Sequence, residues 1–269
     1  MIIPAQNDIA FNLFGISVYW YGVIMAFAIF VSIICANKLL NLCHEELKKD
    51  IILEYSPIII IFGVLCARLY FCFLNPTYYF SHPLEILDIR EGGLSIHGAI
   101  IGGILSIFLL VKKYKLNFLT VIDPIACATF LGQTIGRWGN YFNSEAYGLP
   151  VAGQSWGLYI PLKKRISEFN QYDLFHPAFL YESILDFISF IILFFIYKKL
   201  GKQYKGLVFF SYMIFYALIR FAIESIRIDS ALNIGSIPIA KIVSIIMLLV
   251  GIIGTFLVFY KQKIKNPSP

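Results

Sequence analysis

The sequence predicts an all-α polytopic membrane protein with about seven transmembrane helices and a small extracytoplasmic cap between the fourth and fifth. Of the 269 residues, 59% are hydrophobic and only 14% are charged, a composition that excludes an ordinary soluble domain. The apolar residues form long unbroken runs, whereas a transmembrane β-barrel shows short alternating segments. We therefore expect residues 1–269 to form a single integral membrane domain.

Seven apolar runs each approach the roughly 20 residues needed to cross a bilayer core. The expected spans are 18–38, 56–74, 95–111, 121–138, 181–197, 206–226 and 238–260. The third is the weakest, because it opens with the glycine-containing stretch 92–98. Residues 1–17 contain no Lys or Arg, so we expect the first run to be a retained helix rather than a cleaved signal peptide.

Lysines follow the first, third, fifth and seventh spans. They are Lys38, Lys48, Lys49, Lys112, Lys113, Lys115, Lys198, Lys199, Lys202, Lys205, Lys261, Lys263 and Lys265. The other side carries Arg90, Lys163, Lys164, Arg165 and Arg227. By the positive-inside rule, we expect the N-terminus outside and the C-terminus in the cytoplasm. The formal net charge of +6 then reflects membrane orientation, and no nucleic-acid partner is expected.

The longest connection, residues 142–180, follows the fourth span on the outer side. It contains several Gly and Pro residues and a strand-like stretch at 155–160. A long connection beside a polar cluster is more often functional than a bare linker. We therefore expect residues 142–180 to form the extracytoplasmic cap.

The cysteines show no disulfide or metal-binding pattern. They lie in or near apolar runs without CxxC spacing and are Cys35, Cys43, Cys66, Cys72 and Cys127. We expect small core residues rather than disulfides or metal ligands.

A polar stretch, residues 136–148, closes the fourth span. Arg137 and Asn140 are three residues apart and would share a helix face, and Asn143 and Glu145 follow them. A cation, two amides and a carboxylate at the rim of a membrane helix can hold an anionic head group. The alternative is a glycine-capped helix end with Arg137 extending to the interface, which leaves the other three polar residues unexplained.

Further arginines are expected in the outer half of the bilayer. Arg68 lies deep in the second span, where an unpaired cation is costly. The sixth span ends in a polar stripe with spacings of four, four and three, namely Tyr216, Arg220, Glu224 and Arg227. A structural ion pair between Arg220 and Glu224 is the alternative. We expect Arg68, Arg137, Arg220 and Arg227 to converge on an anionic phospholipid, because arginine suits bidentate contact with phosphate.

Aromatic and histidine residues at the outer ends are less specific. Tyr19-Trp20-Tyr21 at the first span is explained by an interfacial aromatic belt. His97 begins the third span and is either a hydrogen-bonded structural residue or a site residue at the depth of Arg137. His176 is interpreted as structural first.

The polar stretch Gly136-Arg137-x-Gly139-Asn140-x-x-Asn143-x-Glu145-x-x-Gly148 resembles the signature of the bacterial prolipoprotein diacylglyceryl transferases. Supporting motifs occur in the family's order and are Trp20-Tyr21-Gly22, Ser95-Ile96-His97-Gly98, His176-Pro177-x-x-Leu180-Tyr181-Glu182 and Arg220-x-x-x-Glu224-x-x-Arg227. Two departures are Tyr141, where the family usually has Phe, and Cys66-Ala67, where Gly-Gly is usual.

The resemblance implies that phosphatidylglycerol donates its diacylglyceryl group to the lipobox cysteine thiol of a preprolipoprotein signal peptide. A thioether forms and glycerol phosphate leaves, in the first step of lipoprotein maturation. The expected location is the bacterial cytoplasmic (inner) membrane, with membrane lipids around the protein and the site toward the outer leaflet. No metal or organic cofactor is implied.

The resemblance also suggests roles for the residues. Arg137 and Arg220 would bind phosphate, with Glu224 orienting Arg220. Tyr21 becomes an essential pocket residue, which overrides the belt interpretation. His97 is the candidate general base, with lipid positioning as its open alternative. The remaining expected substrate-binding residues are Asn140, Asn143, Glu145, Gly148, Arg68 and Arg227.

Three other classes of protein fit less well. An anion transporter often shows paired repeats and broken helices at the midplane, and neither is found in the sequence. An intramembrane hydrolase needs an activated nucleophile or paired Asp residues, for which Ser95 and Ser144 lack the setting. A non-catalytic scaffold leaves the arginines unexplained.

Overall fold

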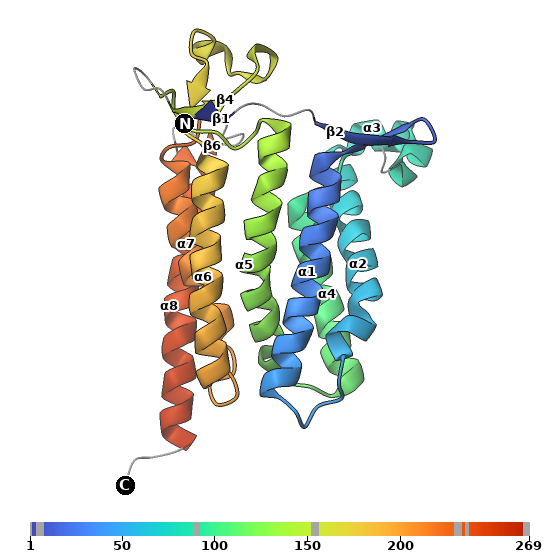
Figure 1. The fold of residues 1–269 in the computed structure, drawn as a ribbon. Coiled ribbons are helices and arrows are strands. Elements are labelled where there is room, and N and C mark those ends of the chain that lie inside the picture. The colour runs from blue at the N-terminus through green and yellow to red at the C-terminus, as the bar shows by residue number, and fades with distance from the viewer. Residues whose placement is uncertain are drawn as a thin grey trace.

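The computed structural model of the chain describes residues 2–3, 8–88, 92–151, 156–228, 233–234 and 237–265. Seven of its helices are long and apolar enough to cross a membrane, which confirms the expected number of spans. They are α1 (Trp20–Cys43), α2 (Ile51–Leu74), α4 (Ile96–Tyr114), α5 (Phe118–Asn143), α6 (Ala178–Leu200), α7 (Leu207–Glu224) and α8 (Ile239–Lys265). Figure 1 shows them side by side in one bundle.

Several helices extend beyond the apolar runs that predict them. α5 continues to Asn143, five residues past the expected end, so the whole Arg137–Asn143 stretch is helical. Its first turn is capped by Asn117, whose side chain accepts a hydrogen bond from the Leu119 N–H, as N-cap residues do. α2 begins at Ile51 and continues through Pro57. α5 therefore continues as a helix through polar residues, and α2 continues through a proline.

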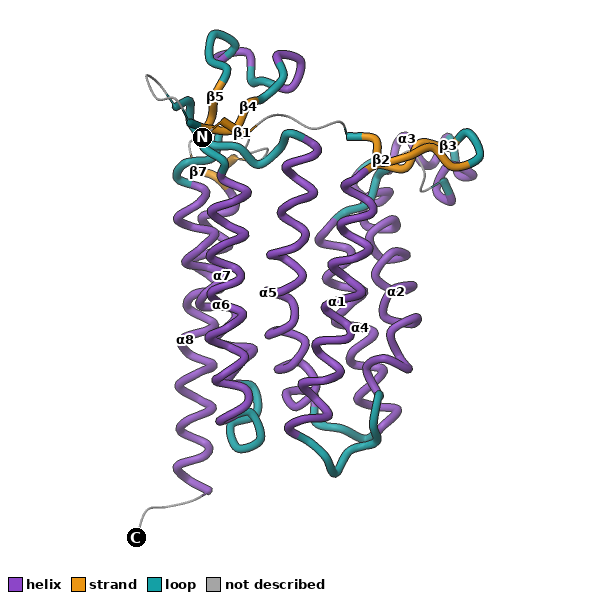
Figure 2. Tube along the Cα trace, viewed as in Figure 1, coloured by secondary structure: helices purple, strands orange, loops and turns teal. Residues whose placement is uncertain are grey.

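Short strands gather at one end of the bundle (Figure 2). β1 (Ile2–Ile3), β4 (Gly157–Tyr159) and β5 (Leu174–Phe175) form a three-stranded sheet, while β2 (Ile9–Leu13) pairs with β3 (Ile16–Tyr19) and β6 (Asn233–Ile234) with β7 (Ile237–Pro238). Short helices α3 (Pro76–Ser81), η1 (Pro83–Leu87), η2 (Leu162–Lys164) and η3 (Ser167–Phe169) complete the described elements. The strand-bearing end is the one where α5 ends and α6 begins.

The opposite end carries most of the lysines. The connections from α1 to α2, from α4 to α5 and from α6 to α7 lie there, together with the last residues of α8 (Figure 1). The charge segregation along the sequence thus corresponds to two ends of the bundle. Arg90, expected at the other end, lies outside the described residues.

Helix packing brings α5, α6 and α7 together. α1 packs on α5, α5 packs on α6 and α7, and α2 packs on α4. A buried apolar cluster between α1, α5, α6 and α7 includes Phe130, Leu193, Tyr197 and Val208.

A buried carboxylate fixes the start of α7 against α5. Asp123, inside α5, accepts hydrogen bonds from the Gly206 N–H at 2.7 Å and the Phe209 N–H at 2.8 Å. The first N–H groups of a helix have no partner within the helix, so an external carboxylate satisfies them and complements the helix dipole. Asp123 therefore sets the height of α7 relative to α5.

Candidate active site

An ion-pair network joins α5 to α6 near the strand-bearing end. The Arg137 guanidinium of α5 forms an ion pair with Glu182 of α6, and its Nε lies 3.9 Å from Asp186 Oδ2. Both carboxylates are about 1% exposed, whereas the Arg137 side chain is 19% exposed. A buried carboxylate needs such a partner, because an uncompensated charge is costly in the membrane interior.

The same network continues to α7. Arg220 Nη2 lies 2.7 Å from Glu224 Oε2, one helical turn away, and Arg220 Nη1 lies 4.0 Å from Glu182 Oε1. Glu182 is thus shared by two guanidinium groups from different helices. These contacts bring together two arginines that the sequence placed on separate spans.

Polar and aromatic side chains hold the three helices together on the bundle-centre side of this network. Ser183 of α6 donates a hydrogen bond to the Thr134 carbonyl of α5 at 2.8 Å. Gln133 of α5 donates to the Tyr212 hydroxyl of α7 at 3.1 Å, and the Tyr212 ring stacks on Tyr216 with 5.9 Å between centroids. The two hydrogen bonds join α5 to α6 and to α7 next to the arginines, and the ring stacking lies within α7.

Tyr21 of α1 lies against Gly139 of α5, two residues after Arg137. A Cβ atom at Gly139 would come within 2.9 Å of the Tyr21 ring, so this close approach requires glycine. The structure therefore places the expected pocket tyrosine against the polar stretch of α5 that carries Arg137.

The end of α5 carries the remaining polar residues of the stretch. Ser144 adopts a left-handed conformation, with φ of 55°, and ends the helix. The Glu145 N–H donates to the Asn140 carbonyl at 2.9 Å, and Asn143 Nδ2 donates to Glu145 Oε1 at 3.2 Å. Asn143 and Glu145 thus act as a pair, next to the first turn of the connection to α6.

Backbone contacts tie this connection to the end of α7. Gly148 forms a β-bridge with Arg227, and its N–H donates to the His176 carbonyl at 2.8 Å. A Cβ atom at Gly148 would lie 2.9 Å from the Ile226 carbonyl oxygen, so a larger residue would push the two segments apart. Gly148 and Arg227 therefore join through the backbone at the same end as Arg220.

Arg68 does not join the other arginines, which corrects the expected convergence of all four. Its guanidinium donates to the backbone carbonyls of Glu85, Ile86, Gly92 and Gly93 and lies over the rings of Phe71 and Tyr79. The physical reason is local. The connection after α2 folds back over the helix end, and its carbonyl oxygens satisfy the buried cation.

His97 lies in the first turn of α4, on the same side of the bundle as Arg68. Its side chain is exposed, and its ring centroid is 5.9 Å from that of Tyr70 in α2. The neighbouring Ser95 N–H donates to the Ala67 carbonyl at 3.1 Å. Among the described residues, no contact connects His97 to Arg137 or Glu182.

Asp186 is missing from the residues that the sequence analysis named, and Glu182 appears there only within a motif, without a predicted role in the site. Both are acidic, four residues apart, inside the apolar run that forms α6. Ionisable residues within a transmembrane segment mark a functional site by default, and a spacing of four puts them on one helix face. That spacing is the signal that could have identified them.

Comparisons with known proteins agree with this architecture. A sequence profile described as prolipoprotein diacylglyceryl transferase matches residues 8–257. Proteins named phosphatidylglycerol–prolipoprotein diacylglyceryl transferase are similar to the chain in Clostridium novyi (strain NT), at 40% identity covering 98% of both chains, and in Clostridioides difficile (strain 630), at 38% identity covering 97% of this chain and 98% of the relative. The relative of the same name in Thermosynechococcus vestitus is 36% identical over 92% of this chain and 91% of its own length. The chain therefore belongs to the prolipoprotein diacylglyceryl transferase family.

Proposed function

We propose that the chain transfers the diacylglyceryl group of phosphatidylglycerol to the lipobox cysteine thiol of a preprolipoprotein, releasing glycerol phosphate. The observation that carries this proposal is the sharing of Glu182 between Arg137 and Arg220. Two guanidinium groups that share one carboxylate can both contact the oxygens of a phosphodiester. The names of the relatives support the same pair of substrates.

We place the reaction at the outer leaflet of the bacterial inner membrane, in one integral membrane domain. The arginine network lies at the end of the bundle opposite the lysine-rich connections, and lysine-rich connections favour the cytoplasm. The N-terminus would then be outside and the C-terminus inside. Residues 142–180, with β4 and β5, would form the extracytoplasmic cap above the site.

The electron flow requires cationic groups beside the departing phosphate. The thiol sulfur attacks the terminal glyceryl carbon, the S–C bond forms, and the C–O bond to phosphate breaks with its electron pair on oxygen. Negative charge therefore grows on the phosphate during the step. Arg137 and Arg220 stabilise that growing charge, and because Glu182 already orients both, little reorganisation is needed.

The thiol needs a proton acceptor, since its ordinary pKa of about 8.5 leaves it largely protonated. His97 remains the candidate general base, with lipid positioning as the alternative. A general base must lie within hydrogen-bond reach of the thiol, and the thiol attacks the carbon that is bonded through one oxygen to the phosphate. A base role therefore requires His97 to come close to the phosphate that Arg137 and Arg220 hold, whereas lipid positioning does not.

The other predicted residues have positioning roles in this proposal. Tyr21 and Asn140 face the glycerol, while Asn143 and Glu145 form the polar edge at the end of α5. Glu224 orients Arg220. Gly148 and Arg227 hold the cap against α7, and Arg68 holds the connection that precedes His97.

A reconstitution assay tests the function. Purified protein is mixed with phosphatidylglycerol and a lipobox peptide, and the peptide mass is followed. We expect a mass increase of one diacylglyceryl group with phosphatidylglycerol and none with phosphatidylcholine or with a peptide whose cysteine is replaced by serine. Lys163→Ala, which removes an exposed cation at the same end of the bundle, is the control variant. Lack of lipidation under conditions where the protein remains folded would contradict the proposal.

A further inference from the structure

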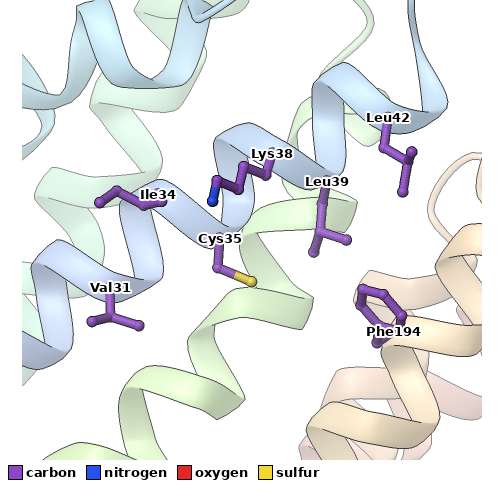
Figure 3. Close-up of a pocket in the computed structure, with 7 residues that line it drawn as sticks. All are labelled: Val31, Ile34, Cys35, Lys38, Leu39, Leu42 and Phe194. Atoms are coloured by element: carbon purple, nitrogen blue, oxygen red, sulfur yellow. The ribbon is translucent and has the colours of Figure 1, made fainter.

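An apolar groove lies between α1 and α6 near the lysine-rich end, far along both helices from the arginine network. Its apolar lining comes from Val31, Ile34, Leu39 and Leu42 of α1 and from Phe194 of α6, and its volume is about 320 Å³. Figure 3 shows Leu39 and Phe194 facing each other across the gap, with α5 behind it. The groove therefore has the composition of a site for a hydrocarbon chain.

One cation, Lys38, lines this groove. It follows Trp20 by 18 residues, which at 1.5 Å per residue is about 27 Å along the helix. The hydrocarbon core of a bilayer is about 30 Å thick, so Lys38 lies close to head-group depth when Trp20 lies at the opposite interface. Lys38 makes no ion pair with any residue in the described ranges. Its ammonium group therefore lies near the lipid head groups without an acidic side chain of the described residues paired with it.

A second hollow adjoins the groove at Leu42 and is lined further by Cys43, Glu45, Lys198 and Lys202. Its volume is about 350 Å³. Lys198, like Lys38, has no ion pair within the part of the chain that the structure describes. The Glu45 carboxylate also lines this hollow and repels an anion. Binding of an anion therefore requires that its attraction to the lysines exceed its repulsion by Glu45.

The neighbouring Lys202 is already neutralised. Its Nζ lies 3.4 Å from Glu46 Oε2. The pKa of Glu46 is lowered to about 2 by a hydrogen bond from its own backbone N–H and one from the His44 side chain, so this carboxylate keeps its charge. Lys38 and Lys198 are therefore the two cations left to meet a ligand.

We propose that this groove binds one anionic phospholipid from the bilayer leaflet that surrounds the lysine-rich end of the bundle. An acyl chain lies along Ile34, Cys35 and Phe194, and the phosphate lies between Lys38 and Lys198. Basic pockets between transmembrane helices bind acidic head groups in this way. Phosphatidylcholine would fill the same apolar surface, but the positive choline group offsets its phosphate charge, so it would attract the two ammonium groups less strongly than an anionic lipid does. The site is separate from the arginine network, which lies at the other end of the bundle.

Photocrosslinking in vesicles tests this site without using enzymatic activity. The full-length protein is reconstituted in phosphatidylcholine vesicles that contain a small fraction of phosphatidic acid with a diazirine on one acyl chain. A parallel sample contains phosphatidylcholine with the same diazirine chain. Crosslinked peptides are identified by mass spectrometry. We expect the phosphatidic acid probe to label residues 31–42 and the peptide containing Phe194 at least fivefold more than the neutral probe.

Variants assign this preference to the lysine. A lysine near the membrane surface contributes roughly a fivefold preference for an acidic lipid, so Lys38→Ala should reduce the preference about fivefold. Lys38→Arg keeps the charge and should keep the preference. Lys112→Ala, at the exposed end of α4 on the same side of the membrane, should leave it unchanged. Equal labelling by the two probes, or an undiminished preference in Lys38→Ala, would overturn the proposal.

Discussion

Replacement of Glu182 by glutamine tests how the two guanidinium groups are held. Glu182→Gln nearly preserves volume but removes the charge that Arg137 and Arg220 share. Removing one partner of a buried ion pair typically costs about 3–5 kcal/mol. Arg137 and Arg220 remain nearly one-fifth exposed and keep Asp186 and Glu224 beside them. We therefore expect a smaller loss in the free energy of unfolding, about 2 kcal/mol.

The same variant should affect turnover more than lipid binding. Without the shared carboxylate, each guanidinium loses the contact that orients it, and misplacement by about 1 Å lowers rates by roughly 10²-fold. The phosphate, however, no longer competes with Glu182 for the arginines. We expect kcat to fall about 10- to 100-fold, while KM for phosphatidylglycerol stays equal or falls.

Lipidation of a lipobox peptide, measured at varied phosphatidylglycerol in mixed micelles, separates these two constants, and denaturant unfolding in the same detergent gives the stability. Glu168→Gln, which changes an exposed carboxylate at the same end, is the matched control and should resemble the wild type. An unchanged kcat together with a raised KM would refute the proposal that Glu182 orients both guanidinium groups.

Three further predictions follow from other contacts. Asp123→Ala removes two hydrogen bonds from the start of α7 and should lower the free energy of unfolding by about 3 kcal/mol; an unfolding curve equal to that of the wild type would contradict the helix-anchoring role. Gly139→Ala should displace the Tyr21 ring and lower the lipidation rate, whereas Gly103→Ala, which meets nothing within 4 Å, should not; equal rates for the two variants would show that the Tyr21 position is unimportant. His97→Gln should remove the limb of the pH–rate profile that a general base produces, and an unchanged profile would argue for lipid positioning instead.

The number and order of the membrane helices follow from the sequence because bilayer thickness imposes a minimum apolar length. The length and composition of each apolar run located the helices, but they did not give the residues at which the helices begin and end. α5 extends to Asn143 because helical hydrogen bonding continues through polar residues that the apolar pattern does not include. The short strands β2 and β3 escaped prediction for a related reason, since a few residues of hairpin carry too little pattern to distinguish from a connection.

The lateral arrangement of the helices limited prediction of the site. Arg68, Arg137 and Arg220 all lie toward one end of the bundle, as their positions in the spans indicated. Which helices are neighbours depends on packing between distant segments, and that information is not present in hydropathy or charge. Arg68 consequently lies with the connection after α2, whereas Arg137 and Arg220 meet through Glu182. The sequence motifs contained the two arginines and Glu182, but they did not indicate that Glu182 lies between the arginines.

Turnover by Arg137→Ala and Arg220→Ala tests most directly whether these two guanidinium groups hold the phosphate. Each loss of a positioned donor to a developing anion typically lowers the rate by about 10²–10³-fold, and we expect at least that loss in each variant, with partial rescue by added guanidinium ion. Near-normal lipidation by both variants, in folded protein, would contradict the account.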